Sequence, residues 1–487
     1  MTVYTDGHGY QYETEKIIRI FYPEEKIYFA ASGEEAEGDV LFTAVSGKGE
    51  NTVFSCRAEI GGKTAEYSFT AFLPEDASDG EKLLAKAIIK VLGEITGIVP
   101  PWGILTGVRP SKLMRKYIAE KGSEEAKNTF TGFLSVSPEK TGLAFNVAEA
   151  ENACIALSAP RSYSLYISIP FCPTRCSYCS FVSHSIEQAK KLIPDYVRLL
   201  CEEISLTAKT AKELGLRLET VYIGGGTPTS LSAGELERIC AALNGSFDMK
   251  SVREFTVEAG RPDTVDSEKL AVLKNAGVSR ISINPQTFSD KVLENIGRKH
   301  TSADIYEKFA LARAAGFDNI NMDLIAGLPG DSPAGFRDSL DRTLALDPEN
   351  VTVHTLALKS SARLVTGEET QTVCRETEEM LAYSRGRLYD AGFFPYYMYR
   401  QSKSVGNLEN VGWAKKGTEC LYNIFMMEEV HTVLAAGGGA VTKLKAPGEN
   451  RIERIYNFKY PYEYISRFDE LCERKNAIKE FYGGISY

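Results

Sequence analysis

Short runs of alternating apolar and polar residues occupy about the first 80 positions of the chain. The runs are KIIRIFY, KIYFAA, DVLFTAV, TVFSCRAEI and AEYSFTAFL, and Gly, Asp and Glu separate them. A period of two is typical of strands with one buried face, so we expect an antiparallel sheet built from hairpins. From about residue 81 the spacing becomes helical, as in EKLLAKAIIKVLGEI and SKLMRKYIAEKG. Residues 1–150 are therefore predicted to form an accessory α+β region.

From Ser164 onward, apolar runs rich in β-branched residues alternate with long amphipathic segments such as 194–215 and 267–277. The runs cover residues 164–169, 219–225, 253–259, 279–284, 318–327 and 350–358. This alternation predicts a parallel sheet covered by helices. Six units fall short of the eight of a closed barrel, so the predicted fold class is α/β, an open (β/α)6 partial TIM barrel over residues 160–365. Active sites in such folds lie at the carboxyl ends of the strands.

Residues 366–487 predict a smaller C-terminal α+β cap. They contain a helical segment (TEEMLAYSRGRLYDAG), an aromatic stretch (FFPYYMYR) and a Gly-rich run at 435–440. No internal repeat is visible in the chain.

Composition and charge narrow the classes of function. The net charge of −9, from 56 basic and 65 acidic residues, argues against broad nucleic-acid binding, which depends on neutralising phosphates. No run approaches the ~18 apolar residues of a membrane span, and the polar N-terminus is unlike a signal peptide. We therefore expect a cytoplasmic protein with no membrane partner, in which the ten cysteines are mostly reduced.

Three of those cysteines lie within eight residues, in the segment YISIPFCPTRCSYC that follows the first predicted strand. Cys172, Cys176 and Cys179 have the spacing C-x3-C-x2-C. Thiolates suit zinc or an iron–sulfur cluster, and a structural zinc site would normally need a second half-site. No second cysteine pair exists, although His184 lies close in sequence. We favour a [4Fe-4S] cluster with three cysteine ligands, whose remaining iron can bind S-adenosylmethionine and pass it an electron.

Other candidate residues end the later strands. GGGTPT (224–229) ends the second strand, where backbone groups can approach a methionine ammonium closely. Glu258 ends the third strand and can accept hydrogen bonds from ribose hydroxyls. Gln286 ends the fourth strand, Arg298 follows it, and Asp323 is a polar residue on the otherwise apolar fifth strand. Each also has a structural interpretation, as a turn, a surface carboxylate or a buried pair.

Several basic and imidazole side chains stay ambiguous. A lone histidine is more often a hydrogen-bonded structural residue, which applies to His184, His300 and His354. Arginine forks pair well with carboxylates, so some of the cations could meet a substrate carboxylate, although most are expected to be solvated. The candidates are Arg109, Arg161, Arg175, Lys299 and Arg400.

The run from Tyr166 to Cys179, with GGGTPT, Glu258, Gln286, Arg298 and Asp323, resembles the oxygen-independent coproporphyrinogen III oxidase family of radical S-adenosylmethionine proteins. The segment GILTGVRPSKLMRKY (103–117) is similar to the HemZ-type branch. The resemblance implies two S-adenosylmethionine molecules. It implies that the first contacts Tyr166, Gly225, Glu258 and Ala357. It implies that the second contacts the backbone of Tyr178, and Gly226, Thr227, Gln286, Arg298 and Asp323.

The resemblance also implies an oxidoreductase of porphyrin and haem biosynthesis. The reaction would be oxidative decarboxylation of coproporphyrinogen III to protoporphyrinogen IX through a 5′-deoxyadenosyl radical, with a reductant protein such as flavodoxin or ferredoxin. The family's oxidases have a further cysteine two places after the third, where this chain has Phe181. A haem-binding chaperone branch also lacks it, but carries His-Asn where this chain reads Tyr422-Asn423. We favour the enzyme, with the chaperone and a two-S-adenosylmethionine radical methyltransferase as alternatives.

Overall fold

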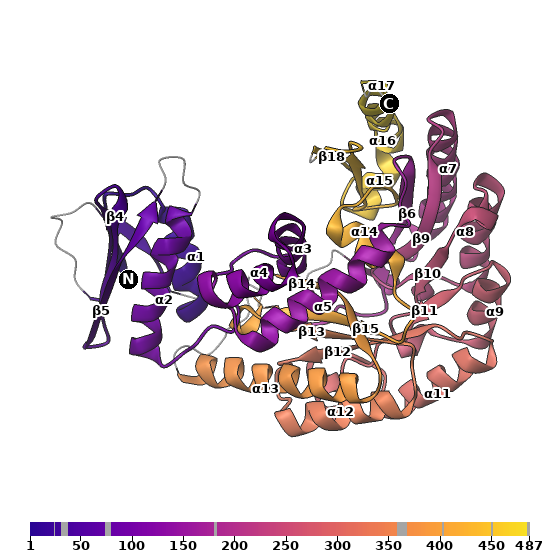
Figure 1. The fold of residues 1–487 in the computed structure, drawn as a ribbon. Coiled ribbons are helices and arrows are strands. Elements are labelled where there is room, and N and C mark those ends of the chain that lie inside the picture. Colours follow the sequence, from indigo (N-terminus) through magenta and orange to yellow (C-terminus); the bar gives the residue numbers. More distant parts are fainter. Residues whose placement is uncertain are drawn as a thin grey trace. The chain divides into compact units, whose positions relative to one another are not determined.

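The computed structural model describes residues 1–23, 25–30, 38–73, 79–179, 183–357, 368–401, 404–449 and 451–484 (Figure 1). The chain divides into two compact units. The first holds Met1–Ala148, Ala362–Arg375 and Tyr399–Glu409, and the second begins at Glu149 and holds the parallel sheet. The boundaries predicted near residues 150 and 365 stay a prediction.

The N-terminal unit contains a five-stranded sheet in the order β2-β1-β3-β4-β5. Its strands are β1 (Thr2–Asp6), β2 (Tyr28–Ala30), β3 (Val40–Ser46), β4 (Gly49–Ile60) and β5 (Lys63–Leu73). Its helices are α1 (Gln11–Phe21), α2 (Gly80–Thr96), α3 (Pro110–Lys121), α4 (Ser123–Asn128) and the first part of α5 (Pro138–Ile155). Strands β3, β4 and β5 form the antiparallel hairpins that the alternation predicts, but β1 pairs in parallel with both β2 and β3.

The prediction of a strand at KIIRIFY is wrong, because these residues belong to helix α1. The buried residues of α1 are Thr14, Ile17, Ile18 and Phe21, which have the spacing of one helical face. In this stretch the helical periodicity outweighs the strand preference of the isoleucines.

The second unit is built on the parallel strands that the sequence predicts. They are β6 (Ser162–Ile169), β9 (Arg217–Gly225), β10 (Glu254–Glu258), β11 (Arg280–Ser282), β12 (Ile320–Ala326) and β13 (Asn350–Thr355). Each pairs in parallel with the next, which confirms the partial-barrel prediction. A strand that the sequence does not predict, β16 (Thr432–Ala436), pairs in parallel with β6 and adds a seventh to the row.

Helices cover the outer face of these strands (Figure 1). They are α7 (Ile193–Glu213), α8 (Ala233–Ser246), α9 (Ser267–Asn275), α10 (Asp290–Asn295), α11 (Ser302–Ala314) and α12 (Pro333–Ala345). Apolar residues of the strands and the inner faces of the helices share one core, in which Ile223, Val257 and Ile281 are fully buried. The helices therefore leave the carboxyl ends of the strands as the edge where polar loops gather.

The remaining elements extend the sheet at both ends or cap it. Strands β14 (Phe394–Arg400) and β15 (Glu409–Ala414) continue it beyond β13, while β17 (Val441–Lys445) and β18 (Ile452–Tyr456) continue it beyond β16. The short pair β7 (Phe171–Cys172) and β8 (His184–Ser185) forms a separate sheet. The other helices are α6 (Ile186–Ala189), α13 (Glu368–Asp390), α14 (Leu421–Glu428), α15 (Pro461–Ser466), α16 (Phe468–Arg474) and α17 (Asn476–Gly483).

The Gly-rich run after β16 lies against the end of β6. A Cβ atom at Gly437 would lie 2.4 Å from the carbonyl oxygen of Ser168, so only glycine fits there. Glu203 on α7 is fully buried and accepts hydrogen bonds from the Gly437 N–H at 2.8 Å and the Tyr464 hydroxyl at 2.6 Å. The C-terminal segment is thereby fixed beside the first strand of the barrel.

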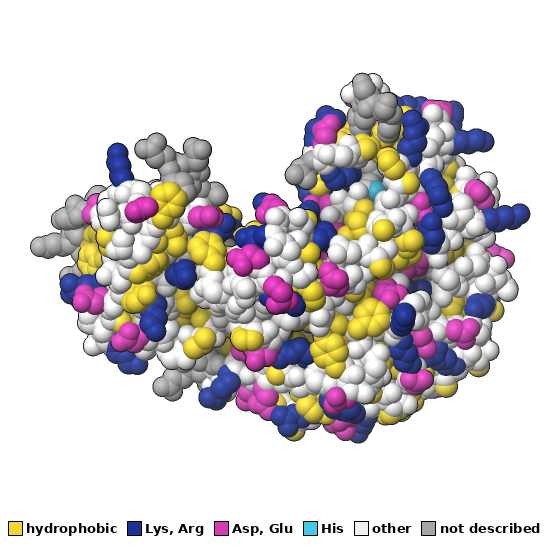
Figure 2. Space-filling view, in the orientation of Figure 1, with side chains coloured by type: hydrophobic (Ala, Val, Ile, Leu, Met, Phe, Trp, Pro, Cys, Tyr) yellow, Lys and Arg dark blue, Asp and Glu magenta, His cyan; other side chains and the backbone are white. Residues whose placement is uncertain are grey.

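Two surface observations bear on partners. Lys, Arg, Asp and Glu side chains are interspersed on the face shown in Figure 2. Over the described residues, we find no helix with both the length and the apolar character needed to cross a bilayer.

Candidate functional site

The three cysteines lie on the loop that leaves β6. Cys172 is the last residue of β7, whereas Cys176 and Cys179 follow in irregular backbone. Two neighbouring loops hold this cysteine loop (residues 170–179) in place. On one side the Thr227 N–H donates to the Phe171 carbonyl at 2.8 Å. On the other side the Ser177 N–H donates to the Ile296 carbonyl at 3.1 Å.

The glycine turn after β9 touches the first cysteine directly. A Cβ atom at Gly226 would lie 2.6 Å from the Phe171 carbonyl oxygen and 3.0 Å from the Cys172 sulfur, so the position requires glycine. The Thr227 hydroxyl lies 3.5 Å from the Cys172 sulfur. Gly225, Gly226 and Thr227, predicted as cofactor contacts, thus lie beside the predicted metal ligand.

Glu258 ends β10 as expected, and three tyrosines lie beside it. The Tyr222 hydroxyl donates to the Glu258 carboxylate at 2.5 Å. Tyr222 stacks on Tyr422 with ring centroids 4.4 Å apart, and Tyr166 stacks near both at 6.2 and 6.1 Å. Burial raises the pKa of Glu258 to about 7, and the Tyr222 hydrogen bond only partly opposes this rise. The carboxyl can therefore change its charge near neutral pH.

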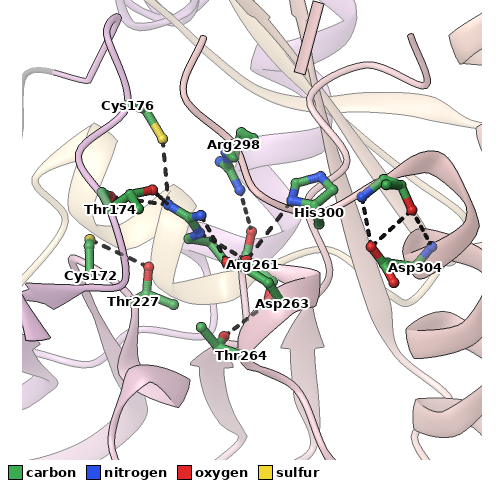
Figure 3. A network of polar contacts seen from close by, with 12 residues as sticks. Cys172, Thr174, Cys176, Thr227, Arg261, Asp263, Thr264, Arg298, His300 and Asp304 are labelled. Atoms are coloured by element: carbon green, nitrogen blue, oxygen red, sulfur yellow. Dashed lines mark hydrogen bonds and ion pairs between the residues drawn. The ribbon is translucent and has the colours of Figure 1, made fainter. Parts of the chain in front are cut away.

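Two arginines that follow the next strands contact the cysteine loop, and Figure 3 shows one of them, Arg261, beside Thr174 and Cys176. Arg298 donates to the Tyr178 hydroxyl at 2.9 Å and to the Gly260 carbonyl at 3.3 Å. Arg261 donates to Thr174 and points its Nη1 atom at the Cys176 sulfur, 3.8 Å away. Burial raises the pKa of Tyr178 to about 12, although the Arg298 guanidinium opposes the rise, so this hydroxyl keeps its proton.

Gln286, in the loop after β11, lies beside Asp323, in the middle of β12. The Gln286 N–H donates to the Asp323 carbonyl at 2.9 Å, and Gln286 has a positive φ of 67°. Its side-chain Oε1 is buried with no hydrogen-bond partner among the described residues. Burial would raise the pKa of Asp323, but His354 at 3.6 Å and a hydrogen bond from Asn321 hold it below its usual value. Asp323 is therefore a carboxylate at neutral pH.

The remaining sequence candidates lie in different places. Ala357 follows β13, where the Leu356 N–H bonds to the end of β12 at Ala326. Phe181 lies outside the described residues. Arg161 lies at the opposite, amino end of β6 and donates to the Leu214 carbonyl.

Other candidates have structural roles. Arg400 is 2% exposed and donates to backbone carbonyls, including that of Leu105, within the N-terminal unit, so it is not a substrate contact of the barrel. His184 pairs with Phe171 in the small β7–β8 sheet.

Sequence reasoning missed two residues that the structure places at this edge, Tyr222 and Arg261. It noted Tyr422 only as the position where the chaperone branch has histidine, and not as a neighbour of Tyr222. Arg261 stands three residues after Glu258, so an inspection of every polar residue in the loop after the third strand would have found it. Tyr422 comes from α14, whose approach to the barrel no local pattern in the sequence indicates.

The donor set fits an iron–sulfur cluster. Thiolates are the usual ligands of such clusters, and three of them would leave one iron of four without a protein ligand. Within the described ranges, no three His, Cys, Asp or Glu side chains converge closely enough to hold a single metal ion. A four-iron cluster is bound at separate corners, so its ligands need not converge on one ion, and the chemistry of the three thiols fits such a cluster.

Comparison with known proteins places the chain in a family. The family model described as the Radical SAM superfamily matches residues 166–343. The oxygen-independent coproporphyrinogen-III oxidase-like protein HemZ of Bacillus subtilis is 37% identical over 473 residues, which cover 95% of this chain and 94% of that protein. The heme chaperone HemW of the same organism is 34% identical over 314 residues, 61% of this chain and 77% of HemW.

A solved structure supports the fold. The coproporphyrinogen III oxidase HemN from Escherichia coli, a radical SAM enzyme, matches 67% of this chain and 73% of its own with a TM-score of 0.50 and 23% identity. Membership of the superfamily implies a [4Fe-4S] cluster and S-adenosylmethionine. The chain belongs to the radical SAM superfamily and, within it, to the family of oxygen-independent coproporphyrinogen III oxidase-like proteins.

Proposed function

We propose that this protein is an oxidoreductase of haem biosynthesis that converts coproporphyrinogen III to protoporphyrinogen IX. The observation that carries the proposal is the similarity to the HemZ protein over 95% of the chain, together with the cysteine loop seated on the glycine turn. Two propionate side chains would each lose a hydrogen atom from the β-carbon, carbon dioxide and one electron, which would pass to a separate one-electron acceptor, leaving a vinyl group. When bound, the cluster and S-adenosylmethionine supply the 5′-deoxyadenosyl radical that takes the hydrogen atom.

In this proposal Cys172, Cys176 and Cys179 hold the cluster, and two S-adenosylmethionine molecules lie beside it. Tyr166, Gly225, Glu258 and Ala357 contact the first molecule. Tyr178, Gly226, Thr227, Gln286, Arg298 and Asp323 surround the second. Support comes from the contacts among these residues, since Thr227 lies beside the Cys172 sulfur and Arg298 beside Tyr178.

The chain's own contribution is to bind and orient. The Glu258 carboxylate can accept hydrogen bonds from the ribose hydroxyls. The unpartnered Oε1 of Gln286 can accept a hydrogen bond from a ligand. Holding the propionate C–H about 3–3.5 Å from the attacking carbon would supply most of the rate enhancement attributable to the protein. A flavodoxin- or ferredoxin-like protein would deliver the electrons. We propose a cytoplasmic location, because all ten cysteines lie among the described residues and none forms a disulfide.

A second candidate function is haem binding without oxidase activity. Its support is the 34% identity to a protein named heme chaperone HemW. Both functions need the cluster, so its detection does not separate them.

The deciding experiment uses the anaerobically reconstituted protein with coproporphyrinogen III, S-adenosylmethionine and a reductant. The oxidase proposal expects protoporphyrinogen and two equivalents of 5′-deoxyadenosine for each product. Cys172→Ser, which removes a ligand, should abolish both, whereas Cys201→Ser, a cysteine on α7, should not. No product together with stoichiometric haem binding would replace the oxidase proposal by the chaperone.

A further inference from the structure

Arg261 occupies an unusual position for a buried cation. It follows the end of β10, and its side chain is 3% exposed. Nη1 donates to the Thr174 carbonyl at 3.1 Å and the Thr174 hydroxyl at 2.9 Å, and lies 3.8 Å from the Cys176 sulfur. Figure 3 shows the guanidinium lying between Asp263 and the cysteine loop.

The orientation of the guanidinium is fixed from the opposite side. Nε and Nη2 of Arg261 donate to the two oxygens of Asp263 at 3.0 and 2.9 Å, a bidentate pair. Because Nε and Nη2 are bound to Asp263, Nη1 is the nitrogen that faces the cysteine loop. Cys176 is also the buried cysteine of the three, at 8% exposure, so water competes little for its sulfur.

The charges around this sulfur do not cancel. Arg261 and Arg298 bring two positive charges, and Asp263 brings one negative charge. His300, 4.0 Å from Asp263, is neutral at physiological pH, because burial and the neighbouring Arg298 lower its pKa to about 4. The protein thus presents a net positive charge on the side of Cys176.

We propose that Arg261 tunes the cluster, by donating a charge-assisted N–H···S hydrogen bond to Cys176 that favours the one-electron-reduced form. Reduction adds one negative charge to the cluster and its thiolates, and the donor that supplies this electron is the reductant of the proposed function. A fixed positive charge in a buried site stabilises the added electron. Hydrogen bonds to cluster sulfurs are among the features that set the potential of such clusters. Arg261 is a positioning residue, since it acts through Cys176, and the inference rests on the proposed assignment of Cys176 as a ligand.

A purely structural role makes a different prediction. If Arg261 only ordered the cysteine loop, its loss would lower the iron content and leave the potential of the loaded fraction unchanged. Asp263→Asn separates the two roles, because it removes the compensating negative charge while Thr174 still holds the guanidinium. Tuning requires the two substitutions to shift the midpoint potential in opposite directions.

The test is a redox titration of the reconstituted full chain, followed by electron paramagnetic resonance of the reduced cluster, with iron and sulfide content measured for each sample. At a fixed applied potential near the wild-type midpoint, Arg261→Met should lower the ratio of reduced to oxidised cluster about tenfold. For a one-electron couple this ratio corresponds to about 59 mV. Arg261→Lys should fall between Met and the wild type, and Asp263→Asn should raise the ratio. Arg253→Met removes the same charge from the amino end of β10, where Arg253 pairs with Glu219 at 2.8 Å, and should leave the ratio unchanged.

Full iron content with an unchanged midpoint in Arg261→Met would overturn the inference and leave the proposed function standing. If the Met variant does not load, unchanged midpoints in both Arg261→Lys and Asp263→Asn overturn it equally. A wild-type protein that takes up no [4Fe-4S] cluster would instead refute the proposed function, and the inference with it.

Discussion

Glu258 gives the sharpest test of the cofactor site, because its charge should change within the working pH range. Its pKa of about 7 means that roughly half of the carboxyl groups are ionised at pH 7. About nine tenths are ionised at pH 8 and one tenth at pH 6. If the ionised carboxylate accepts hydrogen bonds from the ribose hydroxyls, the affinity for S-adenosylmethionine should follow the ionised fraction. It should therefore fall about tenfold from pH 8 to pH 6.

Stability should change with pH in the opposite direction. The folded pKa lies above the ordinary glutamate value of 4.5, so between these two values the folded chain binds more protons than the unfolded chain. Stability then falls as the pH rises through this window, and the contribution of the protonated carboxyl is lost above pH 7. Between pH 6 and pH 8 the expected loss is about 1 kcal/mol. Glu258→Gln cannot ionise and should not show this loss.

The assays are calorimetric binding of S-adenosylmethionine at pH 6, 7 and 8, and urea unfolding of the metal-free protein at pH 6 and 8. The matched control is Glu268→Gln, which removes an exposed carboxylate on α9. This variant should show the wild-type pH dependence of both affinity and stability. The reasoning is refuted if Glu258→Gln keeps the wild-type pH dependence of affinity and of stability.

Three further predictions follow from local geometry. Cys172→Ser should lose most of its iron and sulfide on reconstitution, measured by chemical analysis and absorbance; retention of the full cluster would contradict the ligand assignment. Gly226→Ala places a Cβ atom against Phe171, which should cost about 1–3 kcal/mol in urea unfolding and impair cluster loading. Gly234 lies in α8 with open space around it, so Gly234→Ala should instead stabilise the folded protein by up to about 1 kcal/mol. Equal changes in stability for Gly226→Ala and Gly234→Ala would contradict this prediction. In the N-terminal unit Lys140 and Glu409 form an ion pair of 2.6 Å with both side chains buried. Lys140→Met should therefore cost about 3–5 kcal/mol by denaturation, and a change under 1 kcal/mol would contradict it.

The sequence predicts the barrel well because its strands are buried on both faces, so each strand is a continuous apolar run that can be recognised locally. Runs such as 219–225 and 318–327 need only local β-branched character to be found, and β9 and β12 follow them closely. The failure at α1 has a physical cause. Ile17 and Ile18 favour strands as single residues, but helix α1 packs against α2, which favours the buried helical face that they form with Thr14 and Phe21.

The candidate site shows the same contrast. Cys172, Cys176 and Cys179 could be predicted because ligand spacing is a local property of the chain. Arg261 approaches Cys176 across 85 residues of sequence, and Tyr422 approaches Tyr222 across 200. Such contacts depend on the order of strands in the sheet, and no period or motif within either segment encodes them.

We expect selectivity between the two candidate functions to reside in the C-terminal segment. The strands β6, β9, β10, β11, β12 and β13 and the loops that follow them carry the residues proposed to hold the cluster and S-adenosylmethionine, and both candidate functions use these residues in the same way. The C-terminal segment adds what those loops lack, since β16 closes onto β6 and α14 brings Tyr422 onto Tyr222, the donor to Glu258. A tetrapyrrole that reaches this edge would meet an aromatic face whose last ring comes from the C-terminal segment. We therefore expect substitutions at Tyr422 to alter tetrapyrrole selection while leaving cluster assembly intact, because the Tyr422 ring stacks on Tyr166 and Tyr222, which are not among the proposed cluster ligands.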